Sequence, residues 1–147
     1  MDQRHPDPSP DEFVPVVAFA DSFDARYGLE LLDDDRDGGT VRGRARVTDD
    51  LRQQFGLLHG GVIAAMAESL ASHGTWFGVR GQSKVVMGLS NETNFLRPIT
   101  SGHLNQLAEV RRRGRTRWLW EVQSSDDDQR LCAITMVNIA VRDFPVG

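Results

Sequence analysis

The sequence predicts a single α+β domain in which a curved antiparallel sheet wraps around one buried helix. The chain has 147 residues, the usual length of one domain. Residues 60–78 form an alanine-rich stretch that is apolar on nearly all sides, which is typical of a buried helix. Two alternating segments precede this stretch and four strand candidates follow it. Because one helix cannot cover both faces of a six-stranded sheet, we expect the sheet to curve around it.

The first twelve residues predict a mobile tail. Residues 1–12 contain four acidic residues, three of the six prolines and one apolar residue, Met1. A segment of this composition buries too little apolar surface to fold. We therefore expect one folded domain, over residues 13–147.

Two segments before the helix, residues 25–35 and 40–48, predict a hairpin. Apolar and polar side chains alternate in both, and the turn between them contains Asp37, Gly38 and Gly39. In the first segment, one face is expected to carry Tyr27, Leu29 and Leu31. In the second, one face carries Val41, Gly43, Ala45 and Val47, and the opposite face carries Arg42, Arg44 and Arg46.

Four strands are expected after the helix, over residues 83–97, 102–112, 116–125 and 130–142. Their apolar side chains recur at every second position, as in the series Trp118, Trp120 and Val122. Because the connections are short, each of these strands is expected to pair antiparallel with the next along the chain. The helix itself is expected to end at Gly74 or Gly78.

Composition and charge argue against several functional classes. A net charge of −4 is unlike that of a dedicated nucleic-acid binder. The single cysteine, Cys132, allows no intramolecular disulfide and is expected to be a buried, unreactive thiol. The histidines show no metal-ligand spacing. No apolar run reaches the roughly 18 residues of a membrane span and no signal peptide is evident, so we expect a soluble cytoplasmic protein.

The segment where the helix should begin has the features of an anion site. His59, Gly60 and Gly61 lie at this point. A helix N-terminus presents N–H groups without intrahelical partners and a partial positive charge. Glycine lets a ligand approach that backbone, so the position suits an anion or a developing oxyanion. The structural alternative is that the glycines form only a turn and that the histidine only caps the helix.

Glu68 interrupts the otherwise apolar helix, and Ser72 follows one turn later on the same face. A carboxylate beside a hydroxyl group can activate or hold a water molecule. Glu68 could instead lie on a solvated edge of the helix. The apolar neighbours make that interpretation costly, because a carboxylate in such surroundings needs a partner or a role.

The spacing of these residues has a geometric consequence. Gly60 and Glu68 are eight residues apart, so along one helix they are separated by about 12 Å at ~1.5 Å per residue. One carbonyl carbon cannot be held by the Gly60 amide and reached by Glu68 of the same helix. If both act on one substrate atom, Glu68 must come from a second copy. The chemistry therefore predicts a homodimer with two equivalent shared sites.

The segment FGLLHGG, followed by AES with its glutamate nine residues after the histidine, resembles the hotdog-fold acyl-CoA thioesterases. The likeness is to the PaaI-like branch that includes 1,4-dihydroxy-2-naphthoyl-CoA and Arthrobacter-type 4-hydroxybenzoyl-CoA thioesterases. It extends over residues 24–142 and includes KVVMGLSNETNFLRP and RLCAITMVNIAV. The predicted order of elements matches the hotdog topology independently.

The resemblance implies a role for each residue of the candidate site. Glu68 matches the nucleophile or general base, and the Gly60 amide matches the oxyanion donor. Gln53 matches a side chain that helps to polarise the thioester carbonyl. His59 matches a histidine that lines the site, and Ser72 matches a hydroxyl near the attacking water.

The resemblance also implies the substrate and the assembly. We expect hydrolysis of an aromatic or bulky acyl-CoA to the free acid and CoA, without a metal or redox cofactor. Homodimers are expected to assemble into a tetramer, as a dimer of dimers. The CoA portion is expected to contact Arg97, Arg115, Thr116 and Arg117. Phe95 departs from the family pattern, because some relatives have a polar residue there, and this departure is expected at the CoA end.

Five arginines in seven residues form a basic run, for which the structural alternative is a solvated turn; they are Arg111, Arg112, Arg113, Arg115 and Arg117. Recognition of CoA phosphates is the functional interpretation, and nucleic-acid binding would leave Glu68 unexplained.

Two other functions stay open. An enoyl-thioester hydratase or dehydratase could pair His59 with Glu68 as acid and base. A non-catalytic sensor would bind acyl-CoA without turnover.

Overall fold

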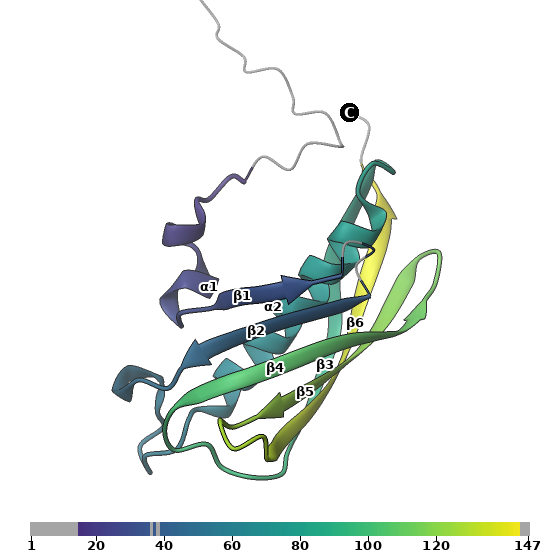
Figure 1. The fold of residues 1–147 in the computed structure, drawn as a ribbon. Helices are drawn as coiled ribbons and strands as arrows, with labels where there is room; N and C mark the ends of the chain where they lie inside the picture. The colour runs from purple at the N-terminus through teal and green to yellow at the C-terminus, as the bar shows by residue number, and fades with distance from the viewer. Residues whose placement is uncertain (1–14, 36, 38, 145–147) are drawn as a thin grey trace, which may run out of the picture.

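The computed structural model describes residues 15–35, 37 and 39–144, so the predicted tail lies outside the described residues. The elements form a curved sheet around one long helix (Figure 1). In chain order they are η1 (Phe19–Asp21), α1 (Phe23–Arg26), β1 (Glu30–Asp34), β2 (Thr40–Arg46), η2 (Asp49–Leu51), α2 (Gly60–Val79), β3 (Lys84–Phe95), β4 (His103–Arg113), β5 (Arg117–Ser125) and β6 (Leu131–Asp143).

The alternating sequence patterns correctly predicted the strands, apart from the start of the first. Residues 23–26 form the short helix α1 instead, because the Ser22 side chain caps it by accepting the N–H of Ala25. Strand β1 therefore begins only at Glu30. Leu31, expected on the buried face, is 46% exposed on this edge strand. The predicted faces of β2 and β5 are confirmed by the burial of their alternate residues.

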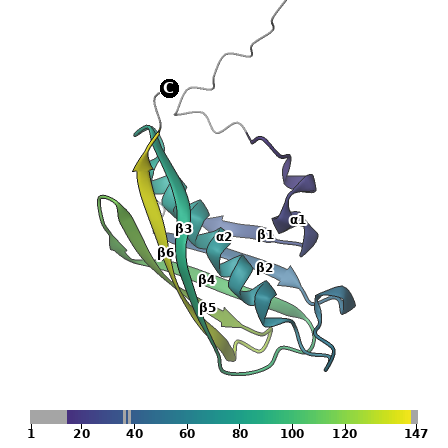
Figure 2. The same cartoon turned by 180° about the vertical axis from the view of Figure 1, so that it is seen from behind.

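The sheet has the order β1-β2-β4-β5-β6-β3, and all its pairs are antiparallel. The expectation that residues 83–97 pair with residues 102–112 is therefore wrong, because β3 pairs with β6 instead. Strands β3 and β4 lie three strand positions apart, about 14 Å at ~4.8 Å per strand. Residues 96–102 can cross that distance at ~3.3 Å per residue. Strand β3 consequently becomes an edge of the sheet, beside β6 (Figure 2).

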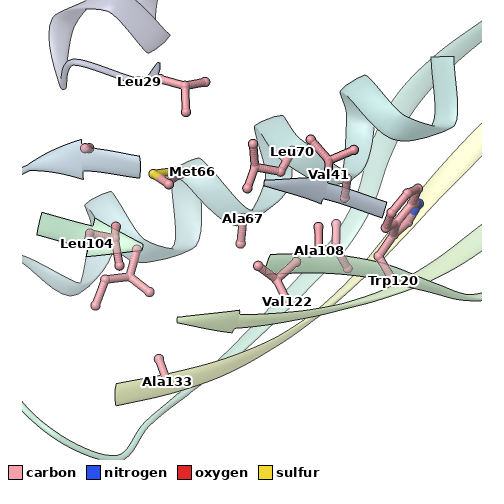
Figure 3. Packing of buried hydrophobic residues seen from close by; sticks show 14 of the residues in the cluster. Leu29, Val41, Met66, Ala67, Leu70, Leu104, Ala108, Trp120, Val122 and Ala133 are labelled. Atoms are coloured by element: carbon pink, nitrogen blue, oxygen red, sulfur yellow. The ribbon is translucent and has the colours of Figure 1, made fainter. Parts of the chain in front are cut away.

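Helix α2 fills the concave face of the sheet, and its residues Met66, Ala67, Leu70 and Ala71 are fully buried. Figure 3 shows Met66, Ala67 and Leu70 facing the sheet, whose side chains Val41, Ala108 and Val122 point toward the helix. Small residues on both sides allow the close approach. At Gly43 of β2, an added Cβ would lie 2.9 Å from Cδ2 of Leu70 on the helix. No helix in the described part of the chain is long and apolar enough to cross a membrane.

The two glycines expected to end the helix serve another purpose. Helix α2 runs through both and ends at Val79. An added Cβ at Gly74 would lie 2.8 Å from Cζ2 of Trp120, and one at Gly78 would lie 3.0 Å from Cζ3 of Trp118. These glycines are therefore packing sites for the indole rings of β5. Trp120 also donates from Nε1 to Thr75 Oγ1 at 2.8 Å, which satisfies its one polar atom in the core.

The packing at Gly74 predicts that Gly74→Ala destabilises the protein, although alanine is favoured over glycine in helices by about 1 kcal/mol. Overpacking against a rigid buried ring costs typically ~1–3 kcal/mol, so we expect a net loss of about 1–2 kcal/mol in the free energy of unfolding. Urea denaturation measures it. The loss should shrink in a Trp120→Phe background, which removes part of the six-membered ring in contact. A Gly74→Ala protein as stable as wild type would contradict this packing account.

Candidate active site

A cleft of about 440 Å³ opens at the N-terminus of α2, and four residues singled out in the sequence meet there. Gln53, Gly60, Phe95 and Arg97 all border it. The rest of its lining is mainly aliphatic and consists of Leu57, Leu58, Ile63, Leu96, Pro98 and Ile99. A second cleft of similar size, bordered by residues such as Leu32 and Leu107, contains none of the predicted site residues.

The first turn of α2 leaves one backbone donor available. His59 is the N-cap, and its Nδ1 accepts the N–H of Gly61 at 2.8 Å. The His59 carbonyl accepts the N–H of Val62 at 3.0 Å. The Gly60 N–H has no acceptor among the described residues. An unpaired N–H at a helix N-terminus that borders a cleft can donate to a carbonyl oxygen or an oxyanion.

The capping bond also constrains His59. Because Nδ1 accepts a hydrogen bond, the proton of a neutral His59 ring lies on Nε2. The side chain is exposed and is not among the residues that line the cleft. His59 therefore serves at least the structural role of a helix cap, and its predicted place in the lining of the site is not seen within one chain.

Gln53 borders the cleft and keeps its side-chain NH2 group free to donate. The turn that holds it is fixed by two backbone bonds, from its N–H to the Leu57 carbonyl at 2.8 Å and from the Gly56 N–H to its carbonyl at 2.9 Å. Its side-chain Oε1 accepts the N–H of Phe55. This bond assigns the amide orientation and leaves Nε2 without an acceptor among the described residues. Gln53 and Gly60 thus contribute two free N–H donors to one cleft.

Phe95 lies over Gly60, in the same cleft as Arg97. An added Cβ at Gly60 would lie 2.7 Å from Cζ of the Phe95 ring, so only glycine leaves room for this contact. The ring is 59% exposed and forms part of the cleft wall. No sequence pattern indicates this contact, because residues 60 and 95 meet only through the packing of α2 on β3.

Glu68 lies near the middle of the outer face of α2, where it is exposed. Its carboxylate has no hydrogen bond or ion pair with a described residue. Its side chain lies against Gly88 of β3, where an added Cβ would approach within 3.1 Å of Glu68 Cδ. Ser72 is half-buried one turn later and makes no recorded hydrogen bond with Glu68. Since Gly60 and Glu68 belong to one continuous helix, the separation of about 12 Å stands.

The basic run divides into paired and unpaired arginines. Arg111 binds Glu121 at 3.0 Å and holds the pKa of that carboxyl below its usual value through their hydrogen bond. Arg113 stacks over the Trp118 ring, 4.7 Å from its centroid. The other members border a cleft of about 420 Å³ lined by Leu89, Arg112, Gly114, Arg115, Thr116, Arg117 and Arg142.

The residues of this arginine cleft differ from the expected CoA-binding set in two ways: one arginine is added and one is absent. Arg142 was not predicted, and it comes from β6, where its Nη1 donates to the Thr116 carbonyl at 2.6 Å. The pairing of Arg117 with Ala140 brings it there, a register that the sequence does not state. Arg97, by contrast, lies in the other cleft, beside Gly60. One chain therefore does not bring Arg97 together with Arg115 and Arg117.

Cys132 is fully buried, and burial raises the pKa of its thiol, as expected for an unreactive cysteine. Within residues 15–35, 37 and 39–144, no three histidine, cysteine or acidic side chains lie close enough together to hold a metal ion.

Comparison with known proteins agrees with this fold. A family model described as the thioesterase superfamily matches residues 55–133. A candidate esterase of Mycobacterium tuberculosis is 37% identical over 134 residues, which cover 90% of this chain and 94% of that protein. The 1,4-dihydroxy-2-naphthoyl-CoA hydrolase of Listeria monocytogenes is 30% identical over 115 residues, 78% of this chain and 91% of the relative.

The crystal structure of a thioesterase from Haemophilus influenzae has a TM-score of 0.80 to this chain at 26% identity, covering 86% of this chain and 87% of that one. A six-stranded antiparallel sheet curved around one long helix is the hotdog fold. The chain belongs to the thioesterase superfamily, whose enzymes hydrolyse thioesters.

The contact between Glu68 and β3 predicts the effect of Gly88→Ala. The added methyl group must displace the Glu68 side chain, which is exposed and free to move, so stability should change by less than about 0.5 kcal/mol. If the position of Glu68 matters for thioester hydrolysis, kcat should fall about tenfold or more. Thermal unfolding and steady-state kinetics separate the two effects. Unchanged kcat in a folded variant would show that this contact has no catalytic importance.

Proposed function

We propose that this protein hydrolyses an aromatic or otherwise bulky acyl-CoA thioester to the free acid and CoA. The observation that carries the proposal is the pair of unpaired N–H donors, from Gly60 and Gln53, at one aliphatic cleft. Two such donors suit a thioester carbonyl whose oxygen gains negative charge during attack. The name of the Listeria relative, a hydrolase of an aromatic CoA thioester, supports this substrate class.

In the proposed reaction, the Gly60 amide and Gln53 hold the carbonyl oxygen. Glu68 either attacks the carbonyl carbon or removes a proton from the water that attacks it. The carbon–sulfur bond then breaks, and the CoA sulfur leaves and takes up a proton. With Glu68 as nucleophile, water hydrolyses the resulting acyl–enzyme anhydride. Ser72, one turn after Glu68, is placed to hold the attacking water.

The proposed site is shared between two subunits. Gly60 and Glu68 are about 12 Å apart on one helix, so a second copy must supply the carboxylate. The edge of β3 opposite β6 supports this assembly, because it is a twelve-residue strand with open backbone groups. Its Met87 and Leu89 side chains are also exposed, at 54% and 52%. Pairing of two β3 edges across a two-fold axis would set the α2 helices antiparallel.

The CoA portion is proposed to bind arginines from both clefts. Arg97 borders the carbonyl cleft, whereas Arg115, Thr116 and Arg117 border the separate arginine cleft. These two sets therefore contact different parts of CoA, or come from different subunits of the expected tetramer. Arginine is suited to phosphate because its planar donors match the phosphate oxygens in pairs.

The hydratase alternative requires His59 as an acid or base beside the carboxylate. The His59 ring nitrogen Nδ1 is already occupied by the Gly61 N–H, which leaves only Nε2 for catalysis. The free donors at Gly60 and Gln53 favour attack at a carbonyl more directly. A sensor would bind acyl-CoA without releasing CoA, and the DTNB measurement described next distinguishes it from the proposed enzyme.

The proposed function predicts release of CoA from at least one of a panel of aryl-, β-keto- and fatty acyl-CoA substrates, measured with DTNB. Glu68→Ala should lose at least ~10²-fold in kcat on the best substrate, because it lacks the nucleophile or base. Circular dichroism and thermal unfolding control for folding. Binding without release in wild type would identify a sensor, and a change in enoyl absorbance without thiol release would identify a hydratase.

The shared site predicts complementation between two inactive variants. One subunit carries Glu68→Ala, and the other carries Gln53→Ala with Gly60→Pro, which removes the amide donor. Proline suits the first position of a helix, but here its ring must displace the exposed Phe95 side chain, so folding of this parent is checked first. In the heterodimer, one site has both lesions and the other has neither. Differently tagged, co-expressed heterodimers should regain up to about half of wild-type activity. Folded heterodimers as inactive as their parents would count against the shared site.

The arginine cleft predicts a KM effect. Arg115→Ala and Arg117→Ala should raise KM for acyl-CoA with little change in kcat, because phosphate contacts far from the carbonyl stabilise ground and transition states alike. Arg111→Ala is the matched control, since Arg111 lies in the same run but is paired with Glu121 outside the cleft. If the cleft variants bind CoA as tightly as this control, the run is a solvated turn.

A further inference from the structure

We infer that Asn91 of β3 is a positioning residue for Glu68, an inference that rests on the proposed function. The observation is a chain of polar side chains that runs from β6 through β3 to the second turn of α2. Its end is a hydrogen bond to the helix at the residue one turn before Glu68. Neither the sequence patterns nor the mechanism above assigned any role to these side chains.

The chain contains three side chains and one helix carbonyl. Asn91 donates from Nδ2 to the carbonyl oxygen of Ala64 at 2.9 Å. Its Oδ1 accepts the hydroxyl of Thr93 at 2.9 Å, and this hydroxyl lies 3.1 Å from that of the fully buried Thr135. Every polar atom of the Asn91 side chain is thus directed by a neighbour, which fixes its donor toward the helix.

The bond to Ala64 is not needed to complete the helix. In an α-helix, the carbonyl of residue 64 already accepts the N–H of residue 68. The Asn91 donor therefore satisfies no orphaned group at a helix end. The bond links the backbone of α2 at residue 64 to the edge strand β3. Glu68 lies one turn later on the same face of the helix, so the bond fixes the position of the Glu68 backbone relative to β3.

A bulge in β3 makes this contact possible. Gly88 pairs with Ile139 and Asn91 pairs with Val137, both of which are buried, so both β3 residues face α2. Strict alternation would put residues 88 and 91 on opposite faces. The register shift between Gly88 and Ser90 leaves Leu89 as the extra residue and corrects the phase.

The bulge thus gives one strand two contacts with the same part of α2. Gly88 leaves room for the Glu68 side chain, and Asn91 holds the carbonyl four residues before it. In the proposed dimer, β3 is also the strand that meets the partner. The same strand would therefore fix Glu68 with respect to the partner's donors, and a displacement near 1 Å there can cost up to ~10²-fold in rate.

The first test compares Asn91→Asp and Asn91→Ser with Asn138→Ala in the full-length protein. Asn91→Asp keeps an acceptor for Thr93 but cannot donate to Ala64, and Asn91→Ser is too short to reach it. Asn138 is the matched control, because its Nδ2 donates to Ser90 Oγ at 2.9 Å across the same two strands on the opposite face. We expect kcat of both Asn91 variants to fall about tenfold with KM within about twofold, and both constants of Asn138→Ala to stay near wild type.

The second test determines in which subunit the Asn91 substitution lowers kcat. In a heterodimer with Glu68→Ala in one subunit, a single working site remains and uses the other subunit's Glu68. Asn91→Ser should lower kcat when it lies in the subunit with the intact Glu68, and should have little effect in the other subunit. Equal losses in both arrangements, or wild-type kcat in both folded Asn91 variants, would overturn the inference. Turnover by wild type and its loss in Glu68→Ala test the proposed function separately, whatever Asn91 does.

Discussion

The structure depends on the close fit of one helix into the concave face of a six-stranded sheet. This fit requires α2 to be small or apolar on most of its surface, and Met66, Ala67, Leu70 and Ala71 have no exposed surface. Glycines are used where indole rings of β5 approach the helix. A polar side chain on α2 is tolerated where it reaches solvent or a polar partner, as Thr75 does with Trp120 and Ser69 with Asp24. The candidate chemistry is found at the first turn and on the face beside β3.

The same fit makes the helix a rigid spacer between its two functional points. The donor at Gly60 and the carboxylate at Glu68 belong to one uninterrupted helix that the sheet holds along its length. Neither point can approach the other by bending. The sequence spacing thus becomes a fixed distance between the two points. In the proposed dimer, the open edge of β3 relates these points to a second copy. The fold and the proposed assembly follow from one packing requirement.

Local patterns in the sequence were sufficient to predict most elements and the start of the site, but not the partners of each element. Alternation shows which side chains share a face, and it does not show which strand lies beside which. The pairing of β3 with β6 was missed for this reason. A glycine in a helical segment can mark the end of the helix or a site of close packing. For Gly74 and Gly78, the packing of Trp120 and Trp118 shows that the second applies. The contact of Phe95 with Gly60 and the direction of the Gln53 amide depend on the assembled fold.

The pairing of β3 has a consequence for the order in which the molecule is completed during synthesis. Gly88 pairs with Ile139 in the sheet register, so β3 gains its neighbour within the chain only after β6 has left the ribosome. Until then, both edges of β3 expose unpaired backbone groups. Such non-local pairing slows folding and leaves a strand vulnerable to aggregation in the interval. Nascent chains that stall before β6 would therefore carry an unprotected strand, whereas complete chains keep only one open edge.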